Sequence, residues 1–334
     1  MKKVIILTLA LVFVLSVSIF AYGESYLLAP KSLNNPYWFA VENGMKDAAK
    51  KLGVKAIFDA PVEADVAKQA QKIIDYVIKG VAGIGISPND PEGIKVAVKK
   101  ALEKGIPVIT FDADAPDSGR YVYIGTNNYV GGYEAGKLMA KFIKKEKADK
   151  SEIKLAILTG GLAALNLNER IKGFRDALGK YCSKKIVYVA DPFPCNDDTA
   201  KSIQIIADVM RKYKDLDGWF MAGGWPLFAP PKSLEQALGG KERVKDLIVI
   251  SFDTLMPELE IVKAGIAKGL VGQRPYMMGY LSMMVLYDMA RLGVEETLRI
   301  LPKDRKIDTG VDIVTQENVV EFMKSVEKIY QKRK

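Results

Sequence analysis

The chain alternates short apolar runs with longer amphipathic segments almost to its end. The runs 82–86, 107–111, 155–158 and 247–250 are apolar nearly throughout, which is typical of strands covered on both faces of a parallel sheet. Between such runs apolar residues recur every three or four positions, for example at Ile94, Ala97, Val98, Ala101 and Leu102. This spacing predicts amphipathic helices. The whole pattern predicts an α/β protein built on parallel sheets.

The strand–helix units form two series. One runs from about residue 26 to 111 and the other from about 153 to 272, while 112–128 is rich in Asp, Gly and Pro. We expect the chain to cross from one lobe to the other within 112–128. Because no low-complexity linker separates the two series, we expect two adjacent lobes with a cleft between them.

The first 23 residues predict a secretory signal peptide. Lys2 and Lys3 precede an apolar run, 4–20, and the small residues Ala21 and Gly23 flank Tyr22, as at a cleavage site. A retained membrane anchor is the alternative, although about 17 residues is near the lower limit for spanning a bilayer. Cleavage near Gly23 would place the mature chain in the periplasm.

Composition removes several classes of function. The chain has no histidine, which excludes histidine as a catalytic base or metal ligand. The net charge is +9, but the lysines are dispersed, so we expect no nucleic-acid partner. Export would permit a disulfide between Cys182 and Cys195. A predicted strand separates them, however, so the flanking segments would have to fold back.

Polar and aromatic residues recur after successive predicted strands, where parallel α/β sheets bind ligands. Carboxylates and amides can pair with hydroxyl groups, and aromatic faces can cover the C–H face of a sugar ring. This mixture favours a binder of a polyhydroxylated ring, without a metal or cofactor. The strand-end candidates are Lys31, Asn35, Tyr37, Trp38, Asp112, Asp114, Asn166, Asn168, Arg170, Asn196, Asp197, Asp198, Trp225, Phe252, Asp253 and Gln273.

Several of these candidates have other interpretations. The segment 34–36 is also a plausible helix start, residues 196–198 are favoured as helix caps, and Lys31 and Arg170 could lie at a rim. Asp112 and Asp114 suggest a second hypothesis, an exported aspartate-based phosphatase acting on sugar phosphates with magnesium. Pro116 occupies the position at which that motif requires Thr or Val. We therefore favour a non-enzymatic binding protein.

The sequence resembles the ribose/galactose class of periplasmic sugar-binding proteins, the solute receptors of ABC importers. The likeness covers nearly all of the predicted mature chain. It is carried by the segments 32–38 (SLNNPYW), 105–112 (GIPVITFD), 123–128 (YIGTNN), 170–174 (RIKGF), 251–253 (SFD) and 272–275 (GQRP).

The resemblance implies a type I periplasmic binding protein fold, with two doubly wound Rossmann-like lobes joined by a three-strand hinge. The expected first lobe is 24–126 plus 274–301, and the expected second lobe is 127–273 plus 302–334. The implied partners are a sugar and a membrane permease, and we expect a monomer. A receptor that serves a sensor kinase would share the site and differ only in its partner.

The resemblance also implies roles for individual residues. The expected ligand-binding residues are Asn35, Tyr37, Trp38, Asp112, Asp114, Asn168, Arg170, Trp225, Phe252, Asp253 and Gln273. The ribose pattern is broken by Ala113 and Asn168, where arginines are usual, and by 223–225 (GGW), where an Asn-Asp pair is usual. We therefore expect a wider ring than ribose, a pyranose such as glucose or xylose or a cyclitol such as myo-inositol, stacked between Trp38 and Trp225. Ribose remains the alternative ligand.

Overall fold

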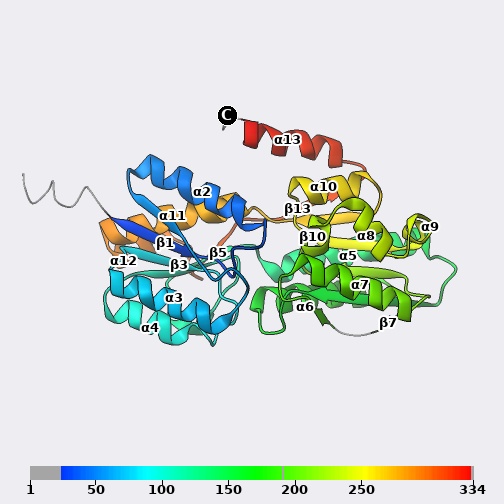
Figure 1. The fold of residues 1–334 in the computed structure, drawn as a ribbon, viewed down its shortest axis with the longest axis horizontal. Coiled ribbons are helices and arrows are strands. Elements are labelled where there is room, and N and C mark those ends of the chain that lie inside the picture. Colours follow the sequence, from blue (N-terminus) through cyan, green and yellow to red (C-terminus); the bar gives the residue numbers. More distant parts are fainter. Residues whose placement is uncertain (1–23, 190–191, 332–334) are drawn as a thin grey trace, which may run out of the picture.

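The fold consists of two α/β lobes side by side, each with a central sheet covered by helices on both faces (Figure 1). The computed structural model describes residues 24–189 and 192–331. The predicted signal peptide, 1–23, lies outside the described residues. The predicted fold class, two doubly wound lobes with mainly parallel sheets, is confirmed.

The sheet of the first lobe has the strand order β12-β5-β4-β3-β1-β2, and all its neighbouring strands are parallel. Helices α2 and α11 pack on one face, and α3 and α4 on the other, so an apolar core lies on each side. The strands are β1 (Ser25–Ala29), β2 (Lys55–Phe58), β3 (Gly83–Ile86), β4 (Val108–Phe111), β5 (Tyr123–Gly125) and β12 (Lys306–Asp308). The helices are α2 (Trp38–Leu52), α3 (Val66–Lys79), α4 (Lys95–Glu103), η1 (Pro116–Ser118), α11 (Pro275–Leu292) and α12 (Val294–Ile300).

The sheet of the second lobe has the order β13-β11-β10-β9-β6-β7, with β8 paired to β6 and only β13 antiparallel among the described strands. The strands are β6 (Glu152–Thr159), β7 (Lys185–Tyr188), β8 (Phe193–Pro194), β9 (Gly218–Met221), β10 (Ile248–Phe252), β11 (Gly269–Gly272) and β13 (Asp312–Thr315). The helices are α5 (Asn128–Glu146), α6 (Leu165–Tyr181), α7 (Thr199–Lys212), η2 (Trp225–Phe228), α8 (Pro231–Ala237), α9 (Lys241–Asp246), α10 (Met256–Lys263) and α13 (Val319–Gln331).

One predicted lobe boundary needs correction. The segment after Leu301 was expected to belong to the second lobe, but β12 pairs with β5 in the first sheet. The last crossing therefore falls between Asp308 and Asp312. The sequence pattern missed β12 because its three residues contain one apolar side chain, Ile307, between two charged ones. So short a run carries no periodicity that distinguishes a strand from a loop.

The three crossings between the lobes are bonded to one another. The Asn127 backbone N–H donates to the Asp308 carboxylate at 3.1 Å. Arg274 donates to the Asp312 carboxylate at 2.9 and 3.1 Å and to the Thr309 carbonyl at 3.2 Å. The three crossings are thus hydrogen-bonded into one unit, although segments far apart in the sequence supply it.

In each lobe two helices cross at close contact through glycines. A Cβ on Gly173 of α6 would lie 2.1 Å from the Tyr129 carbonyl oxygen of α5, and one on Gly132 of α5 would lie 2.0 Å from the Arg170 carbonyl oxygen. Gly44 of α2 and Gly279 of α11 approach each other's helices in the same way. The backbone that carries Arg170 is therefore pressed directly against α5.

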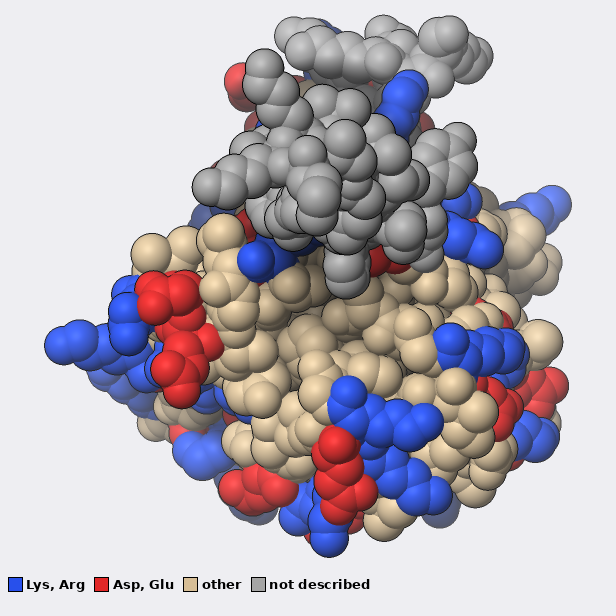
Figure 2. Space-filling model, turned by 90° about the vertical axis from the view of Figure 1, so that its left-hand side faces the viewer, with Lys and Arg blue, Asp and Glu red and all other residues tan. Residues whose placement is uncertain are grey.

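Other surface features add little to the functional question. Cys182 and Cys195 are free thiols. In the part of the chain that the structure describes, no helix is long and apolar enough to cross a membrane. The end of the first lobe seen in Figure 2 carries acidic and basic side chains interspersed around an uncharged central area.

Candidate ligand-binding site

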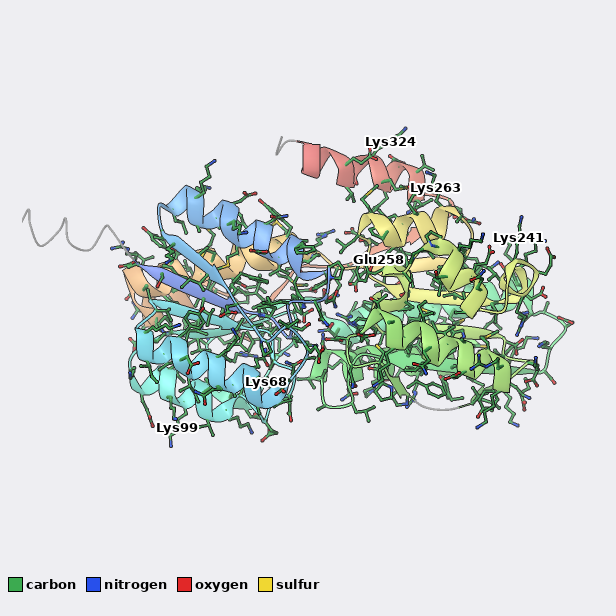
Figure 3. All side chains as sticks on the ribbon, viewed as in Figure 1. Lys68, Lys99, Lys241, Glu258, Lys263 and Lys324 are labelled. Carbon is green, nitrogen blue, oxygen red and sulfur yellow. The ribbon has the colours of Figure 1, made fainter. Side chains whose placement is uncertain are left out.

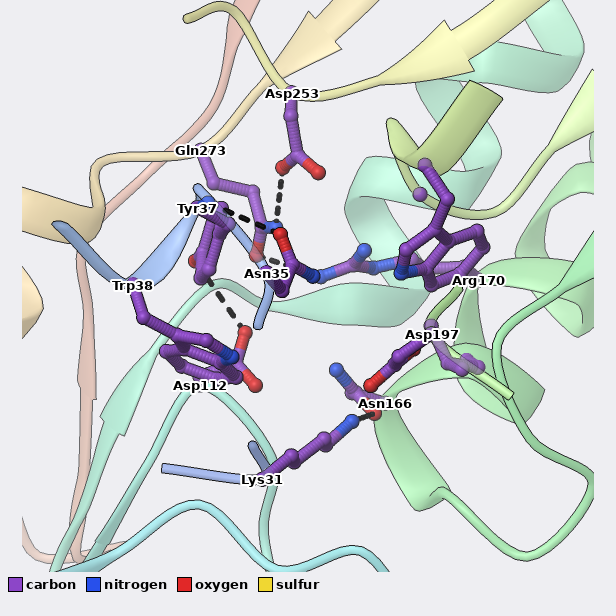
Figure 4. Close-up of a pocket in the computed structure, with 13 residues that line it drawn as sticks. Lys31, Asn35, Tyr37, Trp38, Asp112, Asn166, Arg170, Asp197, Asp253 and Gln273 are labelled. Atoms are coloured by element: carbon purple, nitrogen blue, oxygen red, sulfur yellow. Dashed lines mark hydrogen bonds between the residues drawn. The ribbon is translucent and has the colours of Figure 1, made fainter. Parts of the chain in front are cut away.

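A cavity lies between the lobes, at the carboxyl ends of strands from both sheets. Its empty volume is about 310 Å³, the opening included. Both lobes contribute polar and aromatic side chains, several of which are shown in Figure 4. The lining residues are Lys31, Asn35, Tyr37, Trp38 and Asp112 from the first lobe and Asn166, Leu167, Arg170, Asp197, Gly223, Trp225, Asp253 and Gln273 from the second.

Asp112 is the central acidic group of the first-lobe wall. It follows β4 directly and has a φ of 58°, a left-handed conformation that Asp tolerates better than most residues. Its carboxylate accepts hydrogen bonds from Ser87 Oγ at 2.7 Å and from the Tyr37 hydroxyl at 3.3 Å. Burial, together with the charge of Asp112, raises the pKa of Tyr37 well above its usual value, so that hydroxyl stays a donor at neutral pH.

The loops that carry this wall are bonded together beneath it. Gln69, fully buried on α3, donates to the carbonyl oxygens of Pro30 and Ser87, both at 2.8 Å. Asn89 donates to the Lys31 carbonyl oxygen at 2.9 Å. The loops after β1 and β3 are thereby held at fixed positions beside Asp112.

The second-lobe wall is built around Asp253, which follows β10 with a φ of 75°. Its carboxylate accepts from Gln273 Nε2 at 2.7 Å and from the Gly224 N–H at 3.2 Å. Burial raises the pKa of Asp253, and the nearby Arg170 opposes that rise. Asp112 and Asp253 therefore occupy matching positions, each in a left-handed conformation after a Phe at the end of a buried strand.

Arg170 connects this wall to Asn128, next to the first crossing between the lobes. Its guanidinium donates to Asn128 Oδ1 at 2.9 Å, the Ala222 carbonyl at 2.8 Å and Gln273 Oε1 at 2.6 Å. Asn128 in turn donates to the Tyr123 hydroxyl at 3.1 Å, which lies 2.9 Å from the Asp112 carbonyl oxygen. A continuous hydrogen-bonded path therefore runs from the Asp253 carboxylate through Gln273, Arg170, Asn128 and Tyr123 to the Asp112 backbone carbonyl.

Lys31 spans the cleft. Its ammonium donates to Asn166 Oδ1 of the second lobe at 3.0 Å, with both residues buried. Burial raises the pKa of Asp197, and the charge of the nearby Lys31 ammonium opposes that rise. The polar groups at this end of the cavity thus compensate one another across the two lobes.

The Trp225 ring packs directly against the backbone of two glycines, Gly160 and Gly223. A Cβ on Gly160 would lie 2.6 Å from Trp225 Cζ2 and 2.0 Å from Asp197 Oδ1, and a Cβ on Gly223 would lie 2.6 Å from the same ring. The nearby Trp225 side chain also opposes the rise that burial causes in the pKa of Asp197. Trp225 and Asp197 are therefore positioned as a unit.

Eight of the eleven expected ligand-binding residues line the cavity, and Asp114, Asn168 and Phe252 do not. Asp114 accepts two hydrogen bonds from Arg120, at 2.6 and 2.8 Å, and one from Thr110 at 2.6 Å. Asn168 donates to the Leu162 carbonyl on the exposed side of α6. Phe252 lies under Arg170, whose guanidinium carbon is 4.2 Å from the ring centroid.

Five lining residues were absent from the expected site, namely Lys31, Asn166, Leu167, Asp197 and Gly223. The sequence had placed the three with polar side chains, Lys31, Asn166 and Asp197, after strands. Asn166 and Arg170 are four residues apart on α6 and so share one face, whereas Asn168 lies on the opposite side. That spacing could have selected Asn166. Asp197 was favoured as a helix cap over a ligand contact, but the cap of α7 is Asp198, which accepts from the Lys201 N–H. No feature of the sequence around Lys31 distinguished a lysine inside the cavity from one at its rim.

The two-lobed fold with a polar cavity in its cleft is typical of a protein that binds a small ligand between its lobes. The model of the periplasmic binding protein domain family matches residues 26–294. The chain belongs to this family, and its predicted membership is confirmed. The family consists of binding proteins, in agreement with the prediction of a non-enzymatic chain.

Individual relatives cover nearly the whole chain. A solute binding protein from Burkholderia graminis, solved in complex with D-arabinose, superposes with a TM-score of 0.77 at 32% identity over 88% of this chain and 96% of that chain. GanP, a glucose-galactose binding protein from Geobacillus stearothermophilus, has a TM-score of 0.76 at 26% identity, covering 89% and 98%. The ribose import binding protein RbsB of Haemophilus influenzae is 28% identical over 314 residues, 92% of this chain and 99% of its own length.

The phosphatase hypothesis is not supported by the arrangement of its two acids. Asp112 faces the cavity, whereas both oxygens of Asp114 are held by Arg120. A phosphatase of that type would need both carboxylates free to hold a magnesium ion between them. No group of three or more metal-ligating side chains occurs in the described ranges.

Proposed function

We propose that the protein is an extracytoplasmic receptor that binds a neutral monosaccharide or cyclitol between its lobes and delivers it to the permease of an ABC importer. The observation that carries the proposal is the cavity itself. It presents buried carboxylates from both lobes, Asp112, Asp197 and Asp253, next to aromatic walls. Carboxylates accept hydrogen bonds from hydroxyls, and the named relatives are described as binders of arabinose, glucose, galactose or ribose.

The charges in the cavity favour an uncharged ligand. Arg170 is already engaged by three protein groups, and Lys31 lies beside Asn166 and Asp197. An anionic ligand would need cations without such partners, since phosphate and carboxylate groups are bound by converging arginines or helix N-termini. The acidic groups instead suit hydroxyls, which can donate to them.

Binding would shift the lobes toward the closed arrangement. A ring that contacts Asp112 on one lobe and Asp253 on the other can make both sets of hydrogen bonds only when the cleft is closed. The ligand therefore stabilises the closed state by its differential affinity. We propose that the closed form, as a monomer, is what the permease recognises.

Calorimetric titration against hexoses, pentoses and inositols tests the proposal directly. Heat of binding is expected for at least one neutral ring. Replacing Asp112→Ala should weaken that binding at least tenfold, which corresponds to about 1.4 kcal/mol. The control is Asp117→Ala, an exposed acid in the same loop that lies outside the cavity. Absence of heat with every sugar, in a protein that unfolds cooperatively, would refute the proposal.

A further inference from the structure

The indole nitrogen of Trp38 is a buried donor without a partner. Trp38 is 3% exposed and lines the cavity, and its Nε1 has no hydrogen-bond acceptor among the described residues. Buried donors are nearly always paired in native proteins, and an unpaired one destabilises the state that contains it. The first-lobe wall therefore contains a buried N–H donor that needs a hydrogen-bond acceptor.

The other two tryptophans provide an internal comparison. The chain has three in all. Trp219 points its Nε1 at Met210 Sδ, 3.5 Å away, and the Trp225 side chain lies close enough to Asp197 to affect the pKa of that carboxyl. Of the three indole nitrogens, only that of Trp38 is fully buried without an acceptor among the described residues, and it lies where a ligand would be.

Neighbouring rings fix the orientation of this donor. The Trp38 ring meets Tyr37 edge-on at a centroid distance of 5.0 Å and an interplanar angle of 81°, and it meets Phe111 at 6.2 Å and 89°. In Figure 4 the nitrogen-bearing edge of the indole is directed toward the middle of the cavity. The donor is therefore aimed before any ligand arrives, which lowers the entropic cost of using it.

We propose that Trp38 donates a hydrogen bond from Nε1 to a ligand oxygen, and so acts as a specificity-determining residue and not only as an apolar face. The inference rests on the proposed function. An indole N–H only donates, so its partner must be an acceptor, either a hydroxyl oxygen or the ether oxygen of a sugar ring. An ether oxygen only accepts, so it needs a donor such as this indole N–H, whereas an ionised carboxylate cannot serve it.

Nuclear magnetic resonance of the indole N–H groups tests the proposal on the unaltered protein. Protein labelled with ¹⁵N should give three indole signals, one per tryptophan, and the Trp38 signal is identified as the one missing from Trp38→Phe. When a sugar from the calorimetric panel saturates the protein, the Trp38 proton should move downfield and exchange more slowly with solvent. The Trp219 signal, from the core of the second lobe, should remain unchanged and serves as the control.

Ligand analogues then identify the oxygen. Affinities of the wild type and Trp38→Phe are measured for the sugar, for its deoxy derivatives and for the carbocyclic analogue that lacks the ring oxygen. One of these deletions should cost the wild type about tenfold and the Phe variant less than twofold. Thermal unfolding of Trp38→Phe shows whether that variant is folded, and if it is not, the wild-type resonance shift decides alone.

The outcomes separate the two proposals. If a sugar binds but the Trp38 signal does not move downfield, or if every deletion costs both proteins equally, Trp38 acts only by packing and the inference is wrong. If no sugar binds, the proposed function fails first, and the inference falls with it.

Discussion

Single buried residues set the chemistry of this cleft, and Asp112 and Asp253 show how. Both have positive φ values, 58° and 75°, at the point where a strand ends and the chain must turn. Asp tolerates this conformation and supplies an acceptor at the same place. Replacing either by Asn would keep the backbone preference while removing the charge, which separates the two contributions.

Glu258 is a further buried acid near Asp253, on α10 of the second lobe (Figure 3). Its Oε2 accepts from the Leu255 N–H at 2.6 Å, and its Oε1 has no partner among the described residues. Burial, reinforced by the charge of Asp253, raises the pKa of Glu258 well above its usual value. Ionising this group in the folded state is therefore unfavourable.

We expect Glu258→Gln to stabilise the protein at neutral pH. Both folded and unfolded states are protonated below the ordinary pKa of a glutamate, so the wild type and the variant should then be alike. As pH rises above that value the unfolded wild type ionises first, so its free energy of unfolding falls relative to the variant, by an order of 1–2 kcal/mol. Urea unfolding at pH 4 and pH 7.5 measures the difference, and equal offsets at both pH values would contradict the assignment.

Gly160 and its neighbour Gly161 provide a test variant and a matched control for the role of Trp225 and Asp197. A methyl at Gly160 would lie 2.0 Å from Asp197 Oδ1 and 2.6 Å from Trp225, whereas one at Gly161 meets nothing within 4 Å. Gly160→Ala should therefore displace both side chains and weaken sugar binding at least tenfold. Gly161→Ala should bind like the wild type. Calorimetry on the two variants checks this, and equal affinities would show that Trp225 and Asp197 do not contact the ligand.

Residue-level patterns in the sequence found much of the site, because ligand groups in this fold follow strands. They failed where a partner lies far away along the chain or around a turn. Asp114 was misassigned because nothing local reveals its pairing with Arg120. Asp197 was missed because Asn196 and Asp197 both adopt positive φ values of 56°, which redirect the chain just before α7. Such a turn cannot be inferred from residue types alone.

At the scale of elements, the crossing of α5 and α6 holds Arg170 in place. Gly173 of α6 contacts the α5 backbone, whereas a methyl on Gly179 of the same helix would meet nothing within 4 Å. Gly173→Ala should force the helices apart and destabilise the protein by about 1–3 kcal/mol. Gly179→Ala should stabilise it by about 0.5–1 kcal/mol, through the higher helix propensity of Ala.

Thermal and chemical unfolding of both glycine variants measure these opposite effects. Because the α5–α6 contact carries Arg170, the Gly173 variant should also bind sugar more weakly, and the Gly179 variant should not. A Gly173→Ala protein with wild-type stability would mean that the two helices can separate freely at this crossing.

At the scale of the whole molecule, the contact between Lys31 and Asn166 joins the lobes directly. Removing the ammonium by Lys31→Met should favour the open arrangement in the absence of sugar, because this 3.0 Å hydrogen bond exists only when the cleft is closed. Small-angle X-ray scattering should report a larger radius of gyration for the variant than for the wild type. Lys68→Met is the control, since the ion pair that Lys68 makes with the described residues is to Asp65 on its own lobe. Identical radii for all three proteins would show that Lys31 does not affect closure.

The first lobe is assembled from segments that are synthesised far apart in time, and this affects when it can fold. Residues 24–126 leave the ribosome first, but α2 packs on α11 and β5 pairs with β12, and those partners follow roughly 150 residues later. At typical synthesis rates that delay is about 10–30 s. A nascent chain of this design stays without a complete first domain during the interval. Late folding would suit a polypeptide that is exported unfolded, as the predicted signal peptide implies, because the first lobe is completed only by α11 and β12.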